Sequence, residues 1–171
     1  MDLHGLQRFS LLQDFSDAEL REIFATANEQ RLTAGTFICR EGEPAGSLYF
    51  VVSGQVEISK KAKNGGSYVI TQLSDGALLG ELSWITGTSY GASVQTKQET
   101  VVIRLDGAEL TRQLQKNSAG AQKFHVALLK LLAGRLTRMN EQVLESQAKL
   151  DDQKTGEIER LRERILRDWS F

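Results

Sequence analysis

The spacing of apolar residues changes twice along the chain, and each change marks a different kind of structure. In Ser16–Asn28 the apolar positions fall on one helical face, and Ser16 and Glu19 have the spacing of a capping box. From residue 29 to 105, short β-branched and aromatic runs alternate with Gly, Asp and Asn, and from residue 106 helical spacing returns. This order predicts a β domain flanked by helices.

The middle region has the pattern of short strands joined by tight turns. Its turns are marked by Glu43-Pro44, Ser53-Gly54, Asn64-Gly65-Gly66 and Asp75-Gly76. The predicted strands are Thr36–Cys39, Ser47–Val52, Gln55–Lys60, Tyr68–Leu73, Ala77–Leu79, Ala92–Thr96 and Thr100–Leu105. No helical pattern separates them, so a parallel doubly wound sheet is disfavoured and a sandwich, barrel or roll is predicted.

The next region, residues 106–150, predicts a short helix at Ala108–Gln115 and a long one from about Ser118 to Leu150. One apolar stripe of the long helix steps by three and four, with Ser146 as its only break; it comprises Leu129, Leu132, Leu136, Met139, Val143 and Leu150. Such a seam predicts pairing with a second copy of the chain, and the alternative is a helix buried in its own domain. A second stripe, Phe124, Leu128 and Leu131, is expected to pack on the β domain.

The last region, residues 151–171, predicts a polar break at Asp151–Gly156 and an amphipathic helix at Glu157–Trp169. Its apolar stripe, a candidate docking surface for a partner protein, comprises Ile158, Leu161, Ile165 and Trp169. Acidic residues nearly match the arginines here, which disfavours a basic membrane-binding helix. The chain is therefore divided into an N-terminal helical segment (1–28), a β domain (29–105), a helical region (106–150) and a C-terminal helix (151–171).

Composition excludes several classes of function. Lys and Arg number 21 against 22 Asp and Glu, which gives no support to general binding of nucleic acid or membrane. Cys39 is expected as a buried strand residue, and no Cys or His spacing predicts a metal site. His125 is expected to pack within the long helix, and neither it nor His4 has a nucleophile nearby, so no enzymatic activity is predicted. With no signal-peptide pattern and no apolar run long enough to span a bilayer, the cytoplasm is the expected compartment.

The most informative stretch is Gly80–Val94, GELSWITGTSYGASV. It follows a strand end, enters a short helical turn and returns to a strand at Ala92. Backbone N–H groups at such a strand–turn–helix attract an anion, and Gly80 permits close approach. Glu81 stands at the same rim, where a carboxylate suits a ribose hydroxyl better than a phosphate.

With Gly42–Ile58, GEPAGSLYFVVSGQVEI, this stretch resembles the cyclic nucleotide-binding domain family over most of the chain. The resemblance implies an antiparallel double-stranded β-helix, a jelly-roll-like β-roll, followed by a long C-terminal α-helix. It implies cyclic AMP or cyclic GMP as the ligand of Gly80–Val94, the phosphate-binding cassette, with Glu81 on the ribose 2′-hydroxyl. The residues implied to surround the ligand are Gly80, Glu81, Leu82, Ser83, Tyr90, Gly91, Ala92 and Ser93.

Two neighbouring residues depart from the family's pattern. Cyclic nucleotide binders of this family place an arginine where this chain has Tyr90, and the preceding proline is replaced by Ser89. Losing a charged partner of the phosphate is expected to weaken binding by about one to two orders of magnitude. Three outcomes stay open: weak or altered cyclic nucleotide binding, a different anionic ligand, or a pocket kept for architecture. Lys97 or Arg104 could supply a replacement charge.

These patterns together predict a dimeric regulatory module that senses a cyclic nucleotide weakly or not at all. The alternative is a docking module that acts through its C-terminal helix. A third possibility is a fragment of a bacterial transcription regulator without its DNA-binding domain, because only about 20 residues follow Leu150, too few for a helix-turn-helix domain. Nucleic acid is therefore not an expected partner of this chain.

Overall fold

The computed structural model describes the backbone of residues 4–62 and 65–169, and few side chains beyond Lys149. The chain divides into two compact units, Met1–Leu128 and Leu129–Phe171. The first unit contains all the described strands and the short helices, and the second is the greater part of one long helix.

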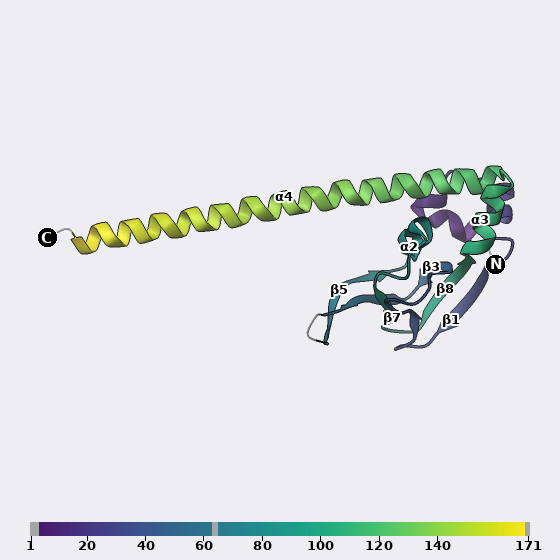
Figure 1. Ribbon diagram of the computed structural model, residues 1–171, viewed down its shortest axis with the longest axis horizontal. Coiled ribbons are helices and arrows are strands. Elements are labelled where there is room, and N and C mark those ends of the chain that lie inside the picture. The colour runs from purple at the N-terminus through teal and green to yellow at the C-terminus, as the bar shows by residue number, and fades with distance from the viewer. Residues whose placement is uncertain (1–3, 63–64, 170–171) are drawn as a thin grey trace. The chain divides into compact units, whose positions relative to one another are not determined.

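The β domain consists of two four-stranded antiparallel sheets (Figure 1). The first sheet has the order β1 (Asn28–Leu32), β8 (Thr100–Asp106), β3 (Ser47–Ser53) and β6 (Leu78–Leu79). The second has the order β2 (Phe37–Cys39), β7 (Ser93–Thr96), β4 (Gln55–Lys61) and β5 (Ser67–Ser74). This confirms the predicted antiparallel β-roll, in which chain neighbours β1 and β2 lie in different sheets.

The N-terminal segment is shorter in helix than its apolar spacing predicts. Two 3-10 helices, η1 (His4–Arg8) and η2 (Ser10–Leu12), precede α1 (Asp17–Ile23). The capping box of Ser16 and Glu19 is present as predicted. The helix ends at Ile23 and not at Asn28, because Asn28 already pairs with Arg104 in the ladder between β1 and β8.

Phe50 of β3 lies at the centre of the aromatic core that joins the sheet to the helices. Its ring centroid is 5.1 Å from that of Phe9, 5.2 Å from that of Phe24 and 6.4 Å from that of Phe124. These rings come from the N-terminal segment and from the beginning of α4, so β3, the segment around α1 and the first turns of α4 share one core. Phe124 and Leu128 are both fully buried, as the predicted second stripe of the long helix requires.

After the sheets, α3 (Gly107–Gln115) and α4 (Ala119–Trp169) begin close to the predicted positions. The predicted break at Asp151–Gly156 is wrong, because α4 continues through it. Most residues there tolerate a helix, and a single interior glycine costs only about 1 kcal/mol. No helix in the part of the chain that the structure describes is both long enough and apolar enough to cross a bilayer.

Candidate functional site

Gly80 forms the sharp turn that connects β6 to α2 (Glu81–Thr86). Its φ of +80° is in the left-handed region, and a Cβ at this position would lie 2.6 Å from the carbonyl oxygen of Ser47. Only glycine fits such a site without displacement of the backbone. The strand–turn–helix predicted for the start of the cassette is therefore the geometry observed.

Tyr90 reaches from the end of the cassette back to this turn. Its side chain is 7% exposed, and its hydroxyl donates to the Ser47 carbonyl oxygen at 3.0 Å and accepts from the Ser47 N–H at 3.3 Å. The ring edge lies 3.3 Å from the position that a Cβ of Gly80 would take. Burial is the main cause that raises the pKa of Tyr90 to about 12, so the hydroxyl stays protonated and neutral at physiological pH.

The backbone of Tyr90 is held as closely as its side chain. Its N–H donates to the Glu43 carbonyl at 2.9 Å, and its carbonyl accepts from the Gly42 N–H at 2.9 Å. Tyr90 therefore connects the two stretches that carry the family resemblance, the Gly42–Ile58 strand pair and the cassette. Its ring also belongs to a buried cluster with Cys39, Val51, Val56, Leu79, Val94 and Val102.

The other predicted ligand residues differ in exposure. Glu81 and Ser83 are 7% and 8% exposed, whereas Leu82 is 60% exposed. At the far end of the cassette Gly91 is exposed, and Ala92 and Ser93 are half-buried. The Ser93 hydroxyl accepts from the Glu41 N–H at 3.0 Å. The chain thus brings the two ends of the cassette together, with Tyr90 packed between Gly80 and the start of β3.

The two basic residues considered as replacements for the missing arginine are both near carboxylates. Lys97 Nζ lies 3.2 Å from Glu57 Oε2. The hydrogen bond that Gln72 donates to Glu57, together with Lys97, lowers the pKa of Glu57. Arg104 Nη2 lies 4.0 Å from Asp106 Oδ2. Each positive charge therefore already has a negative partner outside the cassette.

Trp84 was not among the predicted site residues. It connects the cassette helix α2 to the two helices that follow the roll. Its indole N–H donates to the Gly107 carbonyl at 3.0 Å, with the Thr111 hydroxyl at 3.2 Å. Its ring meets that of His125 in α4 edge-on, with the centroids 5.9 Å apart. His125 therefore packs, as predicted. A tryptophan in the cassette helix and a glycine at the start of α3 are the sequence features that could have suggested this contact.

The remaining candidate residues lie outside the cassette. Burial is the main cause that raises the pKa of the Cys39 thiol to about 11, so this strand residue stays protonated, as its predicted packing role requires. Within the described residues, no group of three or more His, Cys, Asp or Glu could hold a metal ion. The side chains of Leu150 and of the predicted docking stripe, Ile158, Leu161, Ile165 and Trp169, lie outside the described residues.

The fold is similar to that of a solved cyclic nucleotide-binding domain and of a solved sensor domain. The crystal structure of a cyclic nucleotide-binding domain from Methylobacillus flagellatus is 26% identical, with a TM-score of 0.72 over 84% of this chain and 81% of that one. The sensor domain of the transcriptional regulator DNR from Pseudomonas aeruginosa is also 26% identical, with a TM-score of 0.66 over 81% of this chain and 90% of that one.

Curated relatives have the same domain within longer proteins. The CRP-like cAMP-activated global transcriptional regulator of Mycobacterium tuberculosis is 30% identical over 106 residues, which are 62% of this chain and 46% of that protein. A cyclic nucleotide-gated potassium channel of Mesorhizobium japonicum is 30% identical over 99 residues, 58% of this chain and 26% of that protein. This chain thus spans less than half the length of these relatives.

The family model for the cyclic nucleotide-binding domain matches residues 29–117, which include both sheets, the cassette and α3. This range is more than half of the 171 residues. It also contains both stretches on which the resemblance was based. The chain therefore belongs to the cyclic nucleotide-binding domain family, a family of domains found in regulators and channels.

Proposed function

We propose that this chain is a regulatory module whose cassette is closed by its own Tyr90, so that it binds cyclic nucleotides weakly or not at all. One observation supports this proposal above all: the Tyr90 hydroxyl bonds to both polar backbone groups of Ser47 while the ring packs at Gly80. A nucleotide phosphate near Gly80 would have to displace a buried side chain, break these bonds and still lack a cationic partner.

The free energies involved indicate how weak such binding would be. A hydrogen bond to a charged group contributes about 1.5–3 kcal/mol, so loss of the arginine alone weakens binding about ten- to a hundredfold. Displacing Tyr90 adds a cost, because its ring leaves an apolar cluster and both Ser47 groups lose a partner. Lys97 and Arg104 do not offset this cost without leaving Glu57 and Asp106.

Isothermal titration of the full chain with cyclic AMP and with cyclic GMP tests the proposal. We expect no saturable heat at millimolar nucleotide. A Tyr90→Arg variant supplies the cation and removes the closing ring, and it should bind measurably. Tyr90→Phe is the matched control, because it keeps the ring in place without adding a charge, and it should remain unresponsive.

Saturable binding by the unmodified chain with a Kd below about 0.1 mM would contradict the closed cassette. A Tyr90→Arg variant that folds normally but does not bind would show that other groups, such as the buried Glu81, also block the nucleotide. Circular dichroism of each variant distinguishes this outcome from misfolding.

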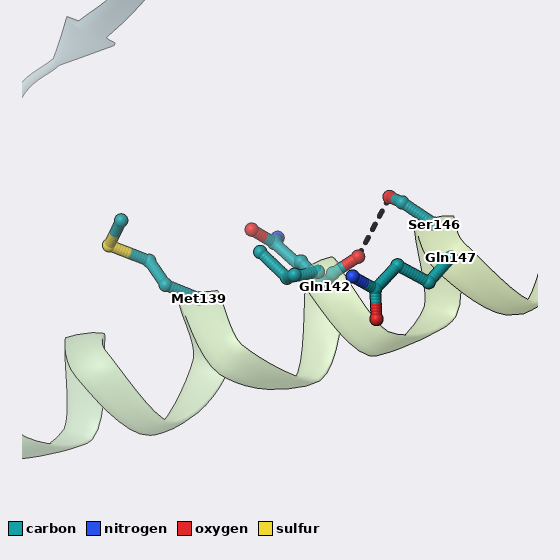
Figure 2. A pocket seen from close by; sticks show the side chains of 5 residues that line it. Met139, Gln142, Ser146 and Gln147 are labelled. Atoms are coloured by element: carbon teal, nitrogen blue, oxygen red, sulfur yellow. Dashed lines mark hydrogen bonds between the residues drawn. The ribbon is translucent and has the colours of Figure 1, made fainter.

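We also propose that the chain dimerises through the seam of α4. Leu129, Leu136, Met139 and Val143 are 44–60% exposed, although their spacing is that of a coiled-coil face. Met139 and Val143 line a shallow apolar depression together with Gln142, Ser146 and Gln147. Figure 2 shows Met139, Gln142 and Ser146 on one side of the helix, where the Ser146 hydroxyl donates to the Gln142 carbonyl at 2.8 Å and so turns its polar atom toward its own backbone.

Sedimentation of the full chain tests this pairing. Met139→Glu with Val143→Glu should remove pairing through α4, because two charges would lie in an apolar seam, so this variant should sediment as a smaller species than the unmodified chain. Leu144→Glu is the matched control: Leu144 is 65% exposed on the same helix but lies outside the seam. Equal effects of the seam and control substitutions would contradict pairing through this face.

A further inference from the structure

The edge strand β5 exposes apolar side chains on both of its faces. It is the last strand of its sheet and pairs only with β4. Tyr68, Val69 and Ile70 are 51%, 55% and 52% exposed. Consecutive strand residues point to opposite faces of a sheet, so neither face of β5 is covered at Tyr68 and Val69. The outer edge of β5 adds a row of backbone groups without a strand partner.

Edge strands in natural proteins usually carry features that prevent further pairing, such as charges, prolines, bulges or short length. The eight residues of β5, SYVITQLS, contain no charge, no proline and no glycine. One bulge, at Ile70, interrupts the ladder, where Ile58 pairs with Thr71 and Ser59 pairs with Val69. An uncharged, β-prone edge of this kind is expected to be covered by another strand.

We infer that β5 pairs with β5 of a second copy of this chain, in antiparallel orientation, so that two four-stranded sheets become one. Charge is the reason to prefer a second copy over another partner. Lys61 stands opposite Ser67, at the first residue of β5, and Asp75 follows its last residue, Ser74; both side chains are exposed. The strand therefore has a positive and a negative end.

An antiparallel pair places the positive end of each β5 beside the negative end of the other. With Ser67 opposite Ser74 of the partner's strand, Lys61 lies two strand spacings, about 10 Å, from the partner's chain near Asp75. The register thus brings the Lys61 ammonium and the partner's Asp75 carboxylate to the same end of the paired sheet, where opposite charges attract. The Lys61 N–H is bound to Glu41 at 2.7 Å, but no described carboxylate forms an ion pair with the Lys61 ammonium group. A two-fold axis makes both charge contacts equal.

Sedimentation over a wide concentration range tests this interface in the full chain carrying Met139→Glu and Val143→Glu, which separates it from the α4 seam. We expect a reversible monomer–dimer equilibrium. Val69→Lys should weaken association at least about tenfold, because a charge would enter the new strand pair. Val69→Thr, which keeps the β-branched shape without a charge, is the matched control and should leave association nearly unchanged.

A charge exchange tests the orientation. Lys61→Glu alone and Asp75→Lys alone should each weaken association, and the double variant should restore it. A chain that stays monomeric at every concentration would overturn the inference. Binding of the monomer to phosphatidylserine vesicles, or to an extended acidic peptide, with loss of binding in Val69→Lys, would overturn it in favour of that occupant. Because all the variants in this test carry the unmodified cassette, the outcome is independent of nucleotide binding.

Discussion

Replacing Tyr90 with phenylalanine removes one oxygen atom from the centre of the closed cassette. That oxygen forms hydrogen bonds with the N–H and the carbonyl of Ser47. Ser47 is 3% exposed, so water does not readily replace the lost oxygen. A neutral hydrogen bond contributes about 0.5–1.5 kcal/mol, and a buried group left without a partner costs about 1–3 kcal/mol. The contact at 3.3 Å is long, so we expect Tyr90→Phe to lower the free energy of unfolding by about 1–2 kcal/mol.

Tyr90→Ala also removes the ring from the buried cluster of β-roll residues around it. Loss of a buried aromatic side chain costs about 3–5 kcal/mol, so the alanine variant should be clearly less stable than the phenylalanine variant. Urea unfolding followed by circular dichroism measures both differences. The slope of the free energy against urea concentration should stay constant, since the folded structure is unchanged.

Tyr68→Phe, measured at a concentration at which the chain is monomeric, is the matched control, because Tyr68 is 51% exposed on β5. It should change the stability by less than about 0.5 kcal/mol, as surface substitutions usually do. If Tyr90→Phe were as mild as Tyr68→Phe, the Tyr90 hydroxyl would not be anchored at Ser47. The mechanism proposed for the closed cassette would then be refuted.

Three further results are expected. The pKa of Tyr90 is raised to about 12, above its ordinary value, so its contribution to stability is present below about pH 10 and lost as the pH rises toward 12; urea midpoints should decline less steeply in Tyr90→Phe than in the unmodified chain, because only the decline caused by Cys39 remains. Bonds from Lys123 and Ser16 lower the pKa of Glu19 to about 2, so its contribution is present above its ordinary pKa and lost as the pH falls toward 2; Glu19→Gln should flatten this acid dependence. Gly107→Ala would place a Cβ 2.7 Å from Trp84 Cδ1, and it should destabilise by about 1–3 kcal/mol and shift the Trp84 fluorescence.

Local patterns were sufficient to predict much of the fold. The strand at Gln55–Lys60, the turn at Ser53-Gly54 and the capping box at Ser16 each depend on neighbouring residues, and each is present. The start of the cassette was predictable for the same reason, since a glycine between a strand end and a helical turn defines Gly80.

What could not be predicted depends on residues far apart in the chain. The direction of the Tyr90 side chain is set by Gly80 and by Ser47, which lies 43 residues earlier in the chain. The early end of α1 is similar, because the ladder between β1 and β8 holds Asn28. At Asp151–Gly156 the error was different: polar composition was taken for a helix break, although none of these residues excludes a helix.

The contacts of the Trp84 indole determine the directions in which a structural change could pass between the cassette and α4. Trp84 belongs to α2, and its indole contacts both the first residue of α3 and His125 of α4, so α2 cannot move without disturbing the first turns of α4. Coupling of this kind is reciprocal, and the same free energy acts whichever end is perturbed. With Tyr90 occupying the cassette, a structural change could therefore start at α4. A partner that bends or rotates the first turns of α4 would loosen Tyr90, and the conformation of the cassette would then depend on that of the helix.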